Sequence, residues 1–147
     1  MSRVSQLLKV AHPEDAKVQT VSPGTSVLAA AKLMRDKEIG ALPVIEEGKL
    51  VGMITERDMT FRILAEGVNP SKVFVSEYMT PDPVYVSPFA DVMDCLNLMK
   101  DKKIRHVPVL EGEKLVGIVS VRDVLYALLK NQELVAQQFE SYITGAR

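Results

Sequence analysis

Residues 39–59 read IGALPVIEEGKLVGMITERDM, and residues 104–124 repeat them as IRHVPVLEGEKLVGIVSVRDV. The two stretches align at a constant offset of 65 residues without a gap, and 10 of their 21 positions are identical. The same offset pairs Val21-Ser22-Pro23 with Val86-Ser87-Pro88. Self-similarity at one fixed spacing indicates a duplicated structural unit, so we interpret the chain as two copies of one fold.

The first half of each copy predicts a turn followed by a helix. A Ser-Pro turn precedes apolar residues at helical spacing, over 27–34 in the first copy and 92–99 in the second. Thr25 or Ser26 can cap the first of these helices, because either hydroxyl accepts a hydrogen bond from a free backbone N–H.

The second half of each copy predicts a hairpin and a second helix. Two apolar runs, joined by about four turn residues rich in Glu, Gly and Lys, have the length of strands. A helix then runs over 57–66, with Gly67 just past its end, and its counterpart begins near Arg122. We therefore expect a mixed α/β (α+β) fold made of two β-α-β-β-α units.

The repeat also suggests how the chain is divided. Residues 4–8 (VSQLL) echo residues 75–79 (VSEYM), so the first copy begins early. The apolar helical pattern of the second copy continues past residue 130, and we favour a self-association helix there over one that folds back on its own module. The expected parts are a first unit with its N-terminal segment (1–68), a linker with the start of the second unit (69–82), the second unit (83–130) and a C-terminal helical extension (131–147).

Composition excludes several functional classes. The chain has 18 basic and 19 acidic residues and a net charge of -1, which argues against broad binding to nucleic acid. No apolar run has the length of a membrane span, and the N-terminus lacks the apolar stretch of a secretory signal. With a single cysteine, Cys95, no internal disulfide is possible, so we expect a cytoplasmic protein.

Neither a metal site nor a catalytic site is expected. His12, His106 and Cys95 do not have the spacing of metal ligands. Neither histidine has an evident serine or cysteine partner for nucleophilic catalysis, so we do not expect an enzyme.

Polar residues recur at one place in each copy, where a strand ends and a helix begins. They are Thr55, Arg57 and Asp58 in the first copy and Ser120, Arg122 and Asp123 in the second. A helix N-terminus with a nearby hydroxyl and arginine favours phosphate, and a carboxylate accepts hydrogen bonds from the hydroxyls of a ribose. The alternative is that these side chains only cap the helix.

With these motifs, the chain resembles a tandem pair of CBS domains, named after cystathionine β-synthase. The resemblance rests on Leu-Pro-Val, Gly-Met-Ile-Thr-Glu-Arg-Asp and Gly-Ile-Val-Ser-Val-Arg-Asp, and it covers about residues 4 to 130. It implies two units packed sheet-to-sheet about a pseudo-two-fold axis, as in stand-alone CBS pairs. It also implies a regulatory, energy-sensing module that binds AMP, ADP or ATP in clefts between the two units. S-adenosylmethionine and NADH are further ligands that the resemblance implies, and no cofactor is required.

The resemblance also implies which residues bind the ligand. Asp58 and Asp123 would hold ribose hydroxyls, and Thr55 and Ser120 would contact ribose or phosphate. The cleft of Thr55–Asp58 would be completed by Val84, Tyr85, Ile104, Arg105 and His106. The cleft of Ser120–Asp123 would be completed by Thr20, Val21, Ile39, Gly40 and Ala41.

Two further expectations follow from the resemblance. Because Arg105 and His106 add cationic or donor groups where Gly40 and Ala41 add none, we expect the Thr55–Asp58 cleft to prefer more phosphate charge. We also expect a homodimer whose regulated partner is a separate protein. The alternative function is a ligand-free interaction module that regulates an enzyme or a transporter.

Overall fold

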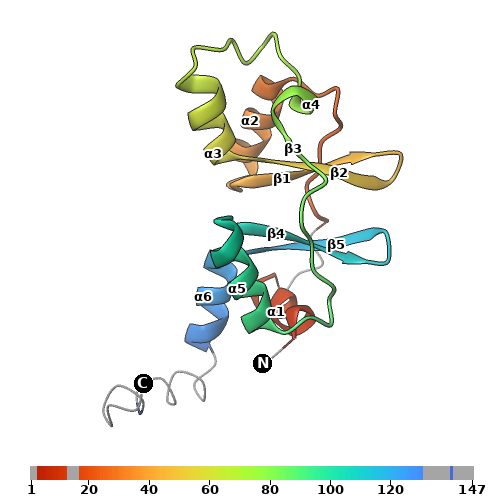
Figure 1. Cartoon of the computed structure of the whole chain (residues 1–147), viewed down its shortest axis with the longest axis vertical. Coiled ribbons are helices and arrows are strands. Elements are labelled where there is room, and N and C mark those ends of the chain that lie inside the picture. The colour runs from red at the N-terminus through yellow and green to blue at the C-terminus, as the bar shows by residue number, and fades with distance from the viewer. Residues whose placement is uncertain (1–2, 13–16, 131–139, 141–147) are drawn as a thin grey trace. The chain divides into compact units, whose positions relative to one another are not determined.

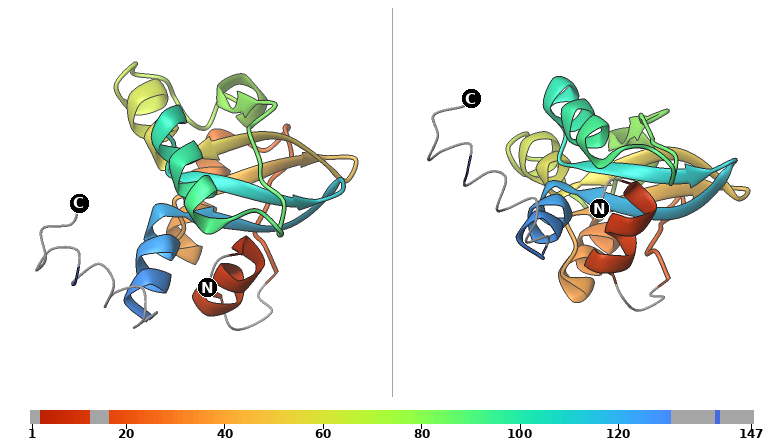
Figure 2. Two further views of the ribbon diagram at one scale, coloured as in Figure 1. Left: turned by 60° about the horizontal axis from the view of Figure 1, so that its bottom comes forward. Right: turned by 90° about the horizontal axis from the view of Figure 1, so that it is seen from below.

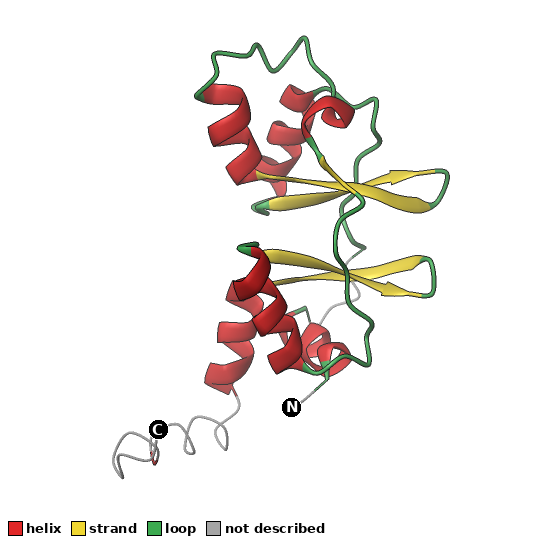
Figure 3. Cartoon of the chain, viewed as in Figure 1, coloured by secondary structure: helices red, strands yellow, loops and turns green. Residues whose placement is uncertain are grey.

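The structure is a computed structural model that describes residues 3–12, 17–130 and 140 of the chain. Its secondary structure is a mixture of helices and short strands, as expected (Figures 1 and 3). By backbone contacts the described residues form two compact units, one made of 3–12, 86–109 and 117–130 and the other of 17–85 and 110–116. None of the helices in these residues has the length and hydrophobicity that a membrane span requires.

The unit that carries the first repeat contains a three-stranded antiparallel sheet with strand order β1-β2-β3. β3 is short because Pro81 within it and Pro83 after it have no backbone N–H to donate to a longer strand ladder. The elements are α2 (Val27–Lys37), β1 (Ala41–Glu46), β2 (Lys49–Thr55), α3 (Glu56–Asp58), the π-helical turn η1 (Met59–Leu64), α4 (Val75–Tyr78) and β3 (Thr80–Pro81).

The second repeat has the same hairpin followed by a regular α-helix. β4 and β5 form a two-stranded sheet. The elements are α1 (Val4–Ala11), α5 (Val92–Lys102), β4 (His106–Glu111), β5 (Lys114–Ser120) and α6 (Val121–Lys130).

The predicted first strand of each repeat is reduced to a single bridge. Val21 pairs with Val44 and Val86 with Val109, both in parallel orientation. The N–H of Val21 donates to Pro43 and that of Val86 to Pro108, each at 3.0 Å. The duplication therefore extends to equivalent backbone hydrogen bonds.

Both hairpins turn in two residues, fewer than the four that we expected. In the first hairpin Glu47 and Gly48 lie between the strands, with φ of 50° and 77°. In the second hairpin Gly112 has a φ of 63°. Positive φ at these positions matches the twist of the paired strands, which is why short hairpin loops favour glycine.

Side-chain caps start the two equivalent helices. Ser26, one of the two predicted caps, accepts the N–H of Ala29 at 3.0 Å. Asp91 takes the same place in the second repeat and accepts the N–H of Met93 at 2.7 Å. Both helices end in a left-handed residue, Glu38 (φ 54°) and Lys103 (φ 56°).

The core is aliphatic, as the low aromatic content predicts. In the first-repeat unit one buried cluster joins α2, strands β1 and β2 and the residues around them. Its members are Val21, Val27, Ala30, Met34, Leu42, Val44, Ile54, Ile63 and Val75. Burial of this apolar surface is the main force that holds the unit together.

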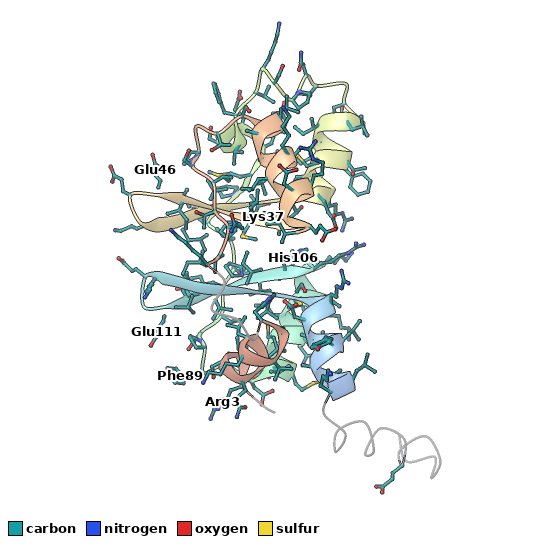
Figure 4. The ribbon with its side chains drawn as sticks, turned by 180° about the vertical axis from the view of Figure 1, so that it is seen from behind. Arg3, Lys37, Glu46, Phe89, His106 and Glu111 are labelled. Atoms are coloured by element: carbon teal, nitrogen blue, oxygen red, sulfur yellow. The ribbon has the colours of Figure 1, made fainter. Side chains whose placement is uncertain are left out.

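The N-terminal segment packs on the second repeat. We grouped residues 1–68 as one unit, but α1 contacts α6 and α5 (Figures 1 and 2). The N–H of Val4 donates to Ala90 at 2.9 Å, and a guanidinium nitrogen of Arg3 donates to the carbonyl of Phe89, beside which it lies in Figure 4. Residues 75–79, which echo residues 4–8, serve the first repeat in the same way, because the N–H of Val75 donates to Thr25 at 2.8 Å.

Two predictions remain, the helix end at Gly67 and the C-terminal helical extension. Gly67 has a φ of 66°, as expected for a residue that ends a helix, although η1 before it is widened to a π-turn in which the N–H of Ala65 donates to Thr60. The helical extension that we predicted over 131–147 lies outside the described residues, apart from Glu140.

Candidate functional site

The first polar motif lies at the end of β2 and closes on itself through reciprocal hydrogen bonds. The Thr55 hydroxyl oxygen accepts the N–H of Asp58 at 3.3 Å. Oδ2 of Asp58 accepts the N–H of Thr55 at 2.9 Å and its hydroxyl proton at 3.2 Å. The motif is therefore a capping box, and the helix-cap interpretation of these residues holds.

The second motif repeats this geometry at the end of β5. The Ser120 hydroxyl oxygen accepts the N–H of Asp123 at 3.0 Å, and Oδ2 of Asp123 accepts the N–H of Ser120 at 2.9 Å. A third group is present here, because Nε2 of His12 lies 3.4 Å from the same Oδ2. The side chain of His12 is 52% exposed and that of Asp123 17%.

Capping uses only part of each carboxylate. In the described part of the chain, every hydrogen bond and ion pair of the Asp58 and Asp123 carboxylates involves Oδ2, so Oδ1 of each has no protein partner. Both residues are half-buried. A carboxylate held by one oxygen presents the other as a hydrogen-bond acceptor, which is the group that a ribose hydroxyl requires.

The residue before each hairpin lies beside the polar motif of its own repeat. The N–H of Glu56 donates to Gly40 at 2.9 Å, and the N–H of Val121 donates to Arg105 at 3.0 Å. A side chain on Gly40 would place its Cβ 3.0 Å from an oxygen of the Glu56 carboxylate. Our prediction instead assigned Ile39, Gly40 and Ala41 to the Ser120–Asp123 cleft and Ile104, Arg105 and His106 to the other. That cross-assignment, and the phosphate preference drawn from it, stay predictions.

The other predicted binding residues have different surroundings. The Arg57 guanidinium lies over the ring of Phe61, 5.3 Å from its centroid. Ala41 is buried and pairs with Thr55 across the hairpin. Val21 is buried in its bridge to β1, whereas Thr20, Val84 and Tyr85 are exposed. In the described residues no hydrogen bond joins Val84 or Tyr85 to Thr55 or Asp58.

Sequence reasoning missed two charged or titratable neighbours of the motifs. His12 was weighed only as a metal ligand and as a catalytic base, and the other copy has no equivalent histidine. Glu56 is replaced by Val121 in the second copy, so comparison of the repeats hides it as well. Residues that differ between copies are the ones that an identity-based search passes over.

Metal and thiol chemistry find little support in the described residues. No three His, Cys, Asp or Glu side chains lie together there as metal ligands would. Cys95 is 1% exposed, and burial raises the pKa of its thiol to about 11. The thiolate is the reactive form, so this cysteine is inert near neutral pH.

The sequence model of the CBS domain matches two segments, residues 13–65 and 75–130. Together these segments cover more than half of the chain, and each contains one hairpin with its polar motif. The chain belongs to the CBS-domain family. It is a CBS pair, and such pairs are regulatory ligand-binding modules.

Known CBS proteins resemble the chain over most of its length. The CBS domain-containing protein YhcV of Bacillus subtilis is 37% identical over 116 residues, which are 79% of this chain and 82% of that protein. A CBS-domain structure from Burkholderia ambifaria superposes with a TM-score of 0.84 at 33% identity, covering 90% of this chain and 96% of that one.

A third CBS structure contains ligands. It is the CBS domain pair of protein MJ0100 in complex with 5′-methylthioadenosine and S-adenosyl-L-methionine. It superposes with a TM-score of 0.71 at 27% identity, covering 86% of this chain and 94% of that one. Both of its ligands contain adenosine.

Proposed function

We propose that this CBS pair is a non-catalytic cytoplasmic sensor that binds adenosine-containing ligands at its Thr55–Asp58 and Ser120–Asp123 motifs. The observation that carries the proposal is the half-used carboxylate of each motif. Asp58 and Asp123 each commit Oδ2 to the cap and leave Oδ1 without a partner in the described residues. An adenosine ribose offers two adjacent hydroxyls to such an oxygen.

The neighbourhood of each motif supports a ligand with a phosphate or another polar group. Each motif stands where a helix begins, and the first backbone N–H groups of a helix favour an anion. Arg57 and Arg122 follow the hydroxyl residues by two positions, and both are exposed. The adenosyl ligands of the MJ0100 pair also support the ligand class. We propose AMP, ADP and ATP as the first ligands to test, then S-adenosylmethionine and NADH.

The experiment is a thermal-unfolding screen with these five compounds and adenosine. A ligand at 100 times its dissociation constant stabilises the folded state by about 2.7 kcal/mol. For a chain of this size that free energy raises the melting temperature by about 5–10 °C. A ligand that binds is then titrated calorimetrically to give the number of sites.

Two matched variants separate ligand binding from capping. Asp58→Asn and Asp123→Asn keep a carbonyl oxygen that accepts the backbone N–H of Thr55 or Ser120, so the capping box stays closed. The amide nitrogen replaces the second acceptor oxygen, so each variant should lose binding at its own motif while its melting temperature without ligand stays close to that of the wild type. Loss of stability with unchanged affinity would show that the motifs only cap.

The competing function is an interaction module that binds no nucleotide and regulates a partner enzyme or transporter. It predicts that none of the six compounds raises the melting temperature. Asp58→Asn and the wild type should then respond to the compounds in the same way. The thermal screen therefore decides between the two functions.

We also propose that the chain forms a homodimer through the exposed face of α6. Leu125 and Leu129 are 56% and 76% exposed, and Tyr126 lies between them. Apolar side chains that gather on one exposed helix face mark an interaction surface. Leu125→Glu combined with Leu129→Lys should convert a dimer to a monomer in analytical ultracentrifugation, and Lys49→Glu, at an exposed position of β2, should not.

A further inference from the structure

The two motifs differ in the second group that lies near Oδ2 of the aspartate. In the first motif, Oδ2 of Asp58 accepts two protons from Thr55, one from its backbone N–H and one from its hydroxyl, at 2.9 and 3.2 Å. In the second motif, Oδ2 of Asp123 accepts only the backbone N–H of Ser120 from within the motif. From outside the motif, His12 Nε2 lies 3.4 Å from that oxygen.

This difference changes what the hydroxyl can do. A hydroxyl has one proton to donate, and the Thr55 hydroxyl donates it to Oδ2 of Asp58. The Ser120 oxygen accepts the N–H of Asp123 at 3.0 Å, and in the described part of the chain its own proton has no acceptor. Ser120 therefore keeps a donor for a bound molecule, at the start of the ten-residue helix α6, where backbone N–H groups also favour an anion.

His12 is held in place by the packing of α1. Its N–H donates to the carbonyl of Leu8 at 2.8 Å, so the residue ends that helix. α1 buries Val4 and Leu7 completely and contacts α6, the helix that carries Asp123. The imidazole thus reaches Asp123 from a segment distant in sequence but belonging to the same compact unit.

We propose that His12 is a positioning residue of the Ser120–Asp123 site that lets the Ser120 hydroxyl bind a phosphate oxygen there, whatever Arg105 and His106 contribute to phosphate binding at the other cleft. By contacting Oδ2 of Asp123 it takes the role that the hydroxyl has in the first motif, and it leaves the Ser120 proton for a phosphate oxygen of an adenosine ligand. Without His12, the Ser120 hydroxyl would turn to Asp123, as Thr55 turns to Asp58. The inference rests on the proposed function and adds a ligand class to one of its two sites.

The test is a double-mutant cycle of His12→Ala and Ser120→Ala, made in the Asp58→Asn background so that only the second site binds. Calorimetry measures the affinities for AMP and adenosine. With His12 present, Ser120→Ala should weaken AMP binding about tenfold, since a hydrogen bond to a charged group is strong. In the His12→Ala variant the same change should weaken it less than twofold, and adenosine affinity should not depend on Ser120 in either background.

A conservative variant and a second measurement exclude a merely structural role for His12. His12→Gln keeps a side-chain N–H and should restore most of the Ser120 effect on AMP. The imidazole ¹⁵N signals of His12 should shift in Asp123→Asn without any ligand, and should not shift in Asp58→Asn; the chain contains only two histidines to assign.

The outcomes separate this inference from the proposed function. The positioning role is wrong if AMP and adenosine bind but the effects of His12→Ala and Ser120→Ala on AMP affinity simply multiply. It is also wrong if the ¹⁵N signals of His12 do not shift in Asp123→Asn. If the signals respond but neither compound binds the wild-type chain, the proposed function fails, and with it the phosphate preference.

Discussion

The side chain of Leu8 lies directly against Gly117 on strand β5. A Cβ added to Gly117 would come within 2.9 Å of a Leu8 methyl group. In the other repeat the side chain of Met79 lies against Gly52 in the same way, and the carbonyl of Thr80 is 3.1 Å from an added Cβ. Residues 4–11 and 75–79 thus each pack against a glycine of the strand that leads to a polar motif.

Replacement of these glycines should be costly to different degrees. Gly52→Ala should lower the free energy of unfolding by about 1–3 kcal/mol, because the new methyl group meets a backbone carbonyl as well as the Met79 side chain. Gly117→Ala should cost less, because the ends of a leucine side chain can rotate away. Urea unfolding measures both. Gly24→Ala, with nothing within 4 Å, is the control and should change stability by less than about 0.5 kcal/mol.

The N-terminal helix should contribute core energy to the second repeat. Leu7 is fully buried, so Leu7→Ala should lower the free energy of unfolding by about 2–5 kcal/mol. Lys9→Ala, on the exposed side of the same helix, should have little effect. Equal stability of the two variants in urea unfolding would contradict the packing of α1 against α5 and α6.

The left-handed residue that ends α5 offers a route to higher stability. Lys103 has a φ of 56°, a conformation that is unfavourable for any residue with a Cβ. Lys103→Gly should therefore stabilise the fold by about 0.5–1 kcal/mol, measured as a rise in melting temperature. Lys102→Gly, one residue earlier and still helical, should destabilise it instead. A lower melting temperature for Lys103→Gly would contradict this account of the helix end.

The buried thiol should make stability depend on alkaline pH. In the unfolded chain Cys95 loses its proton near its ordinary pKa of 9.0, whereas burial raises the pKa in the folded chain to about 11. Between these values the unfolded state binds fewer protons, so the free energy of unfolding should fall as the pH rises. The fall is measured by urea unfolding at several pH values as the difference between the wild type and Cys95→Ala, which cancels the other titrating groups. A difference that stays constant from pH 9 to 11 would contradict the shift.

Much of the fold could be predicted because its signals are local and occur twice. Helical spacing predicted α2 and α5, and apolar runs with a turn predicted both hairpins. The Ser26 cap also depends only on residues close in sequence. Each of these features is decided by neighbouring backbone and side-chain groups, and the 65-residue offset provides a second reading of each.

The candidate site was predicted only in part. The capping boxes at Thr55–Asp58 and Ser120–Asp123 follow from a spacing of three residues. The contact of His12 with Asp123 does not, because the two residues are 111 positions apart in the sequence and the Thr55–Asp58 motif has no equivalent contact in the described residues.

The sequence by itself determined the duplication, the helix and hairpin that the two copies share, and the two polar motifs at the strand ends. Only the tertiary structure decided that residues 4–11 and 75–78 each pack on the repeat with which they are not contiguous. The reason is physical: the N–H groups of Val4 and Val75 find acceptors at Ala90 and Thr25, and Leu8 and Met79 find space at Gly117 and Gly52. These contacts depend on complementary shape and on hydrogen bonds between segments that are distant in sequence. Neither composition nor residue spacing predicts them.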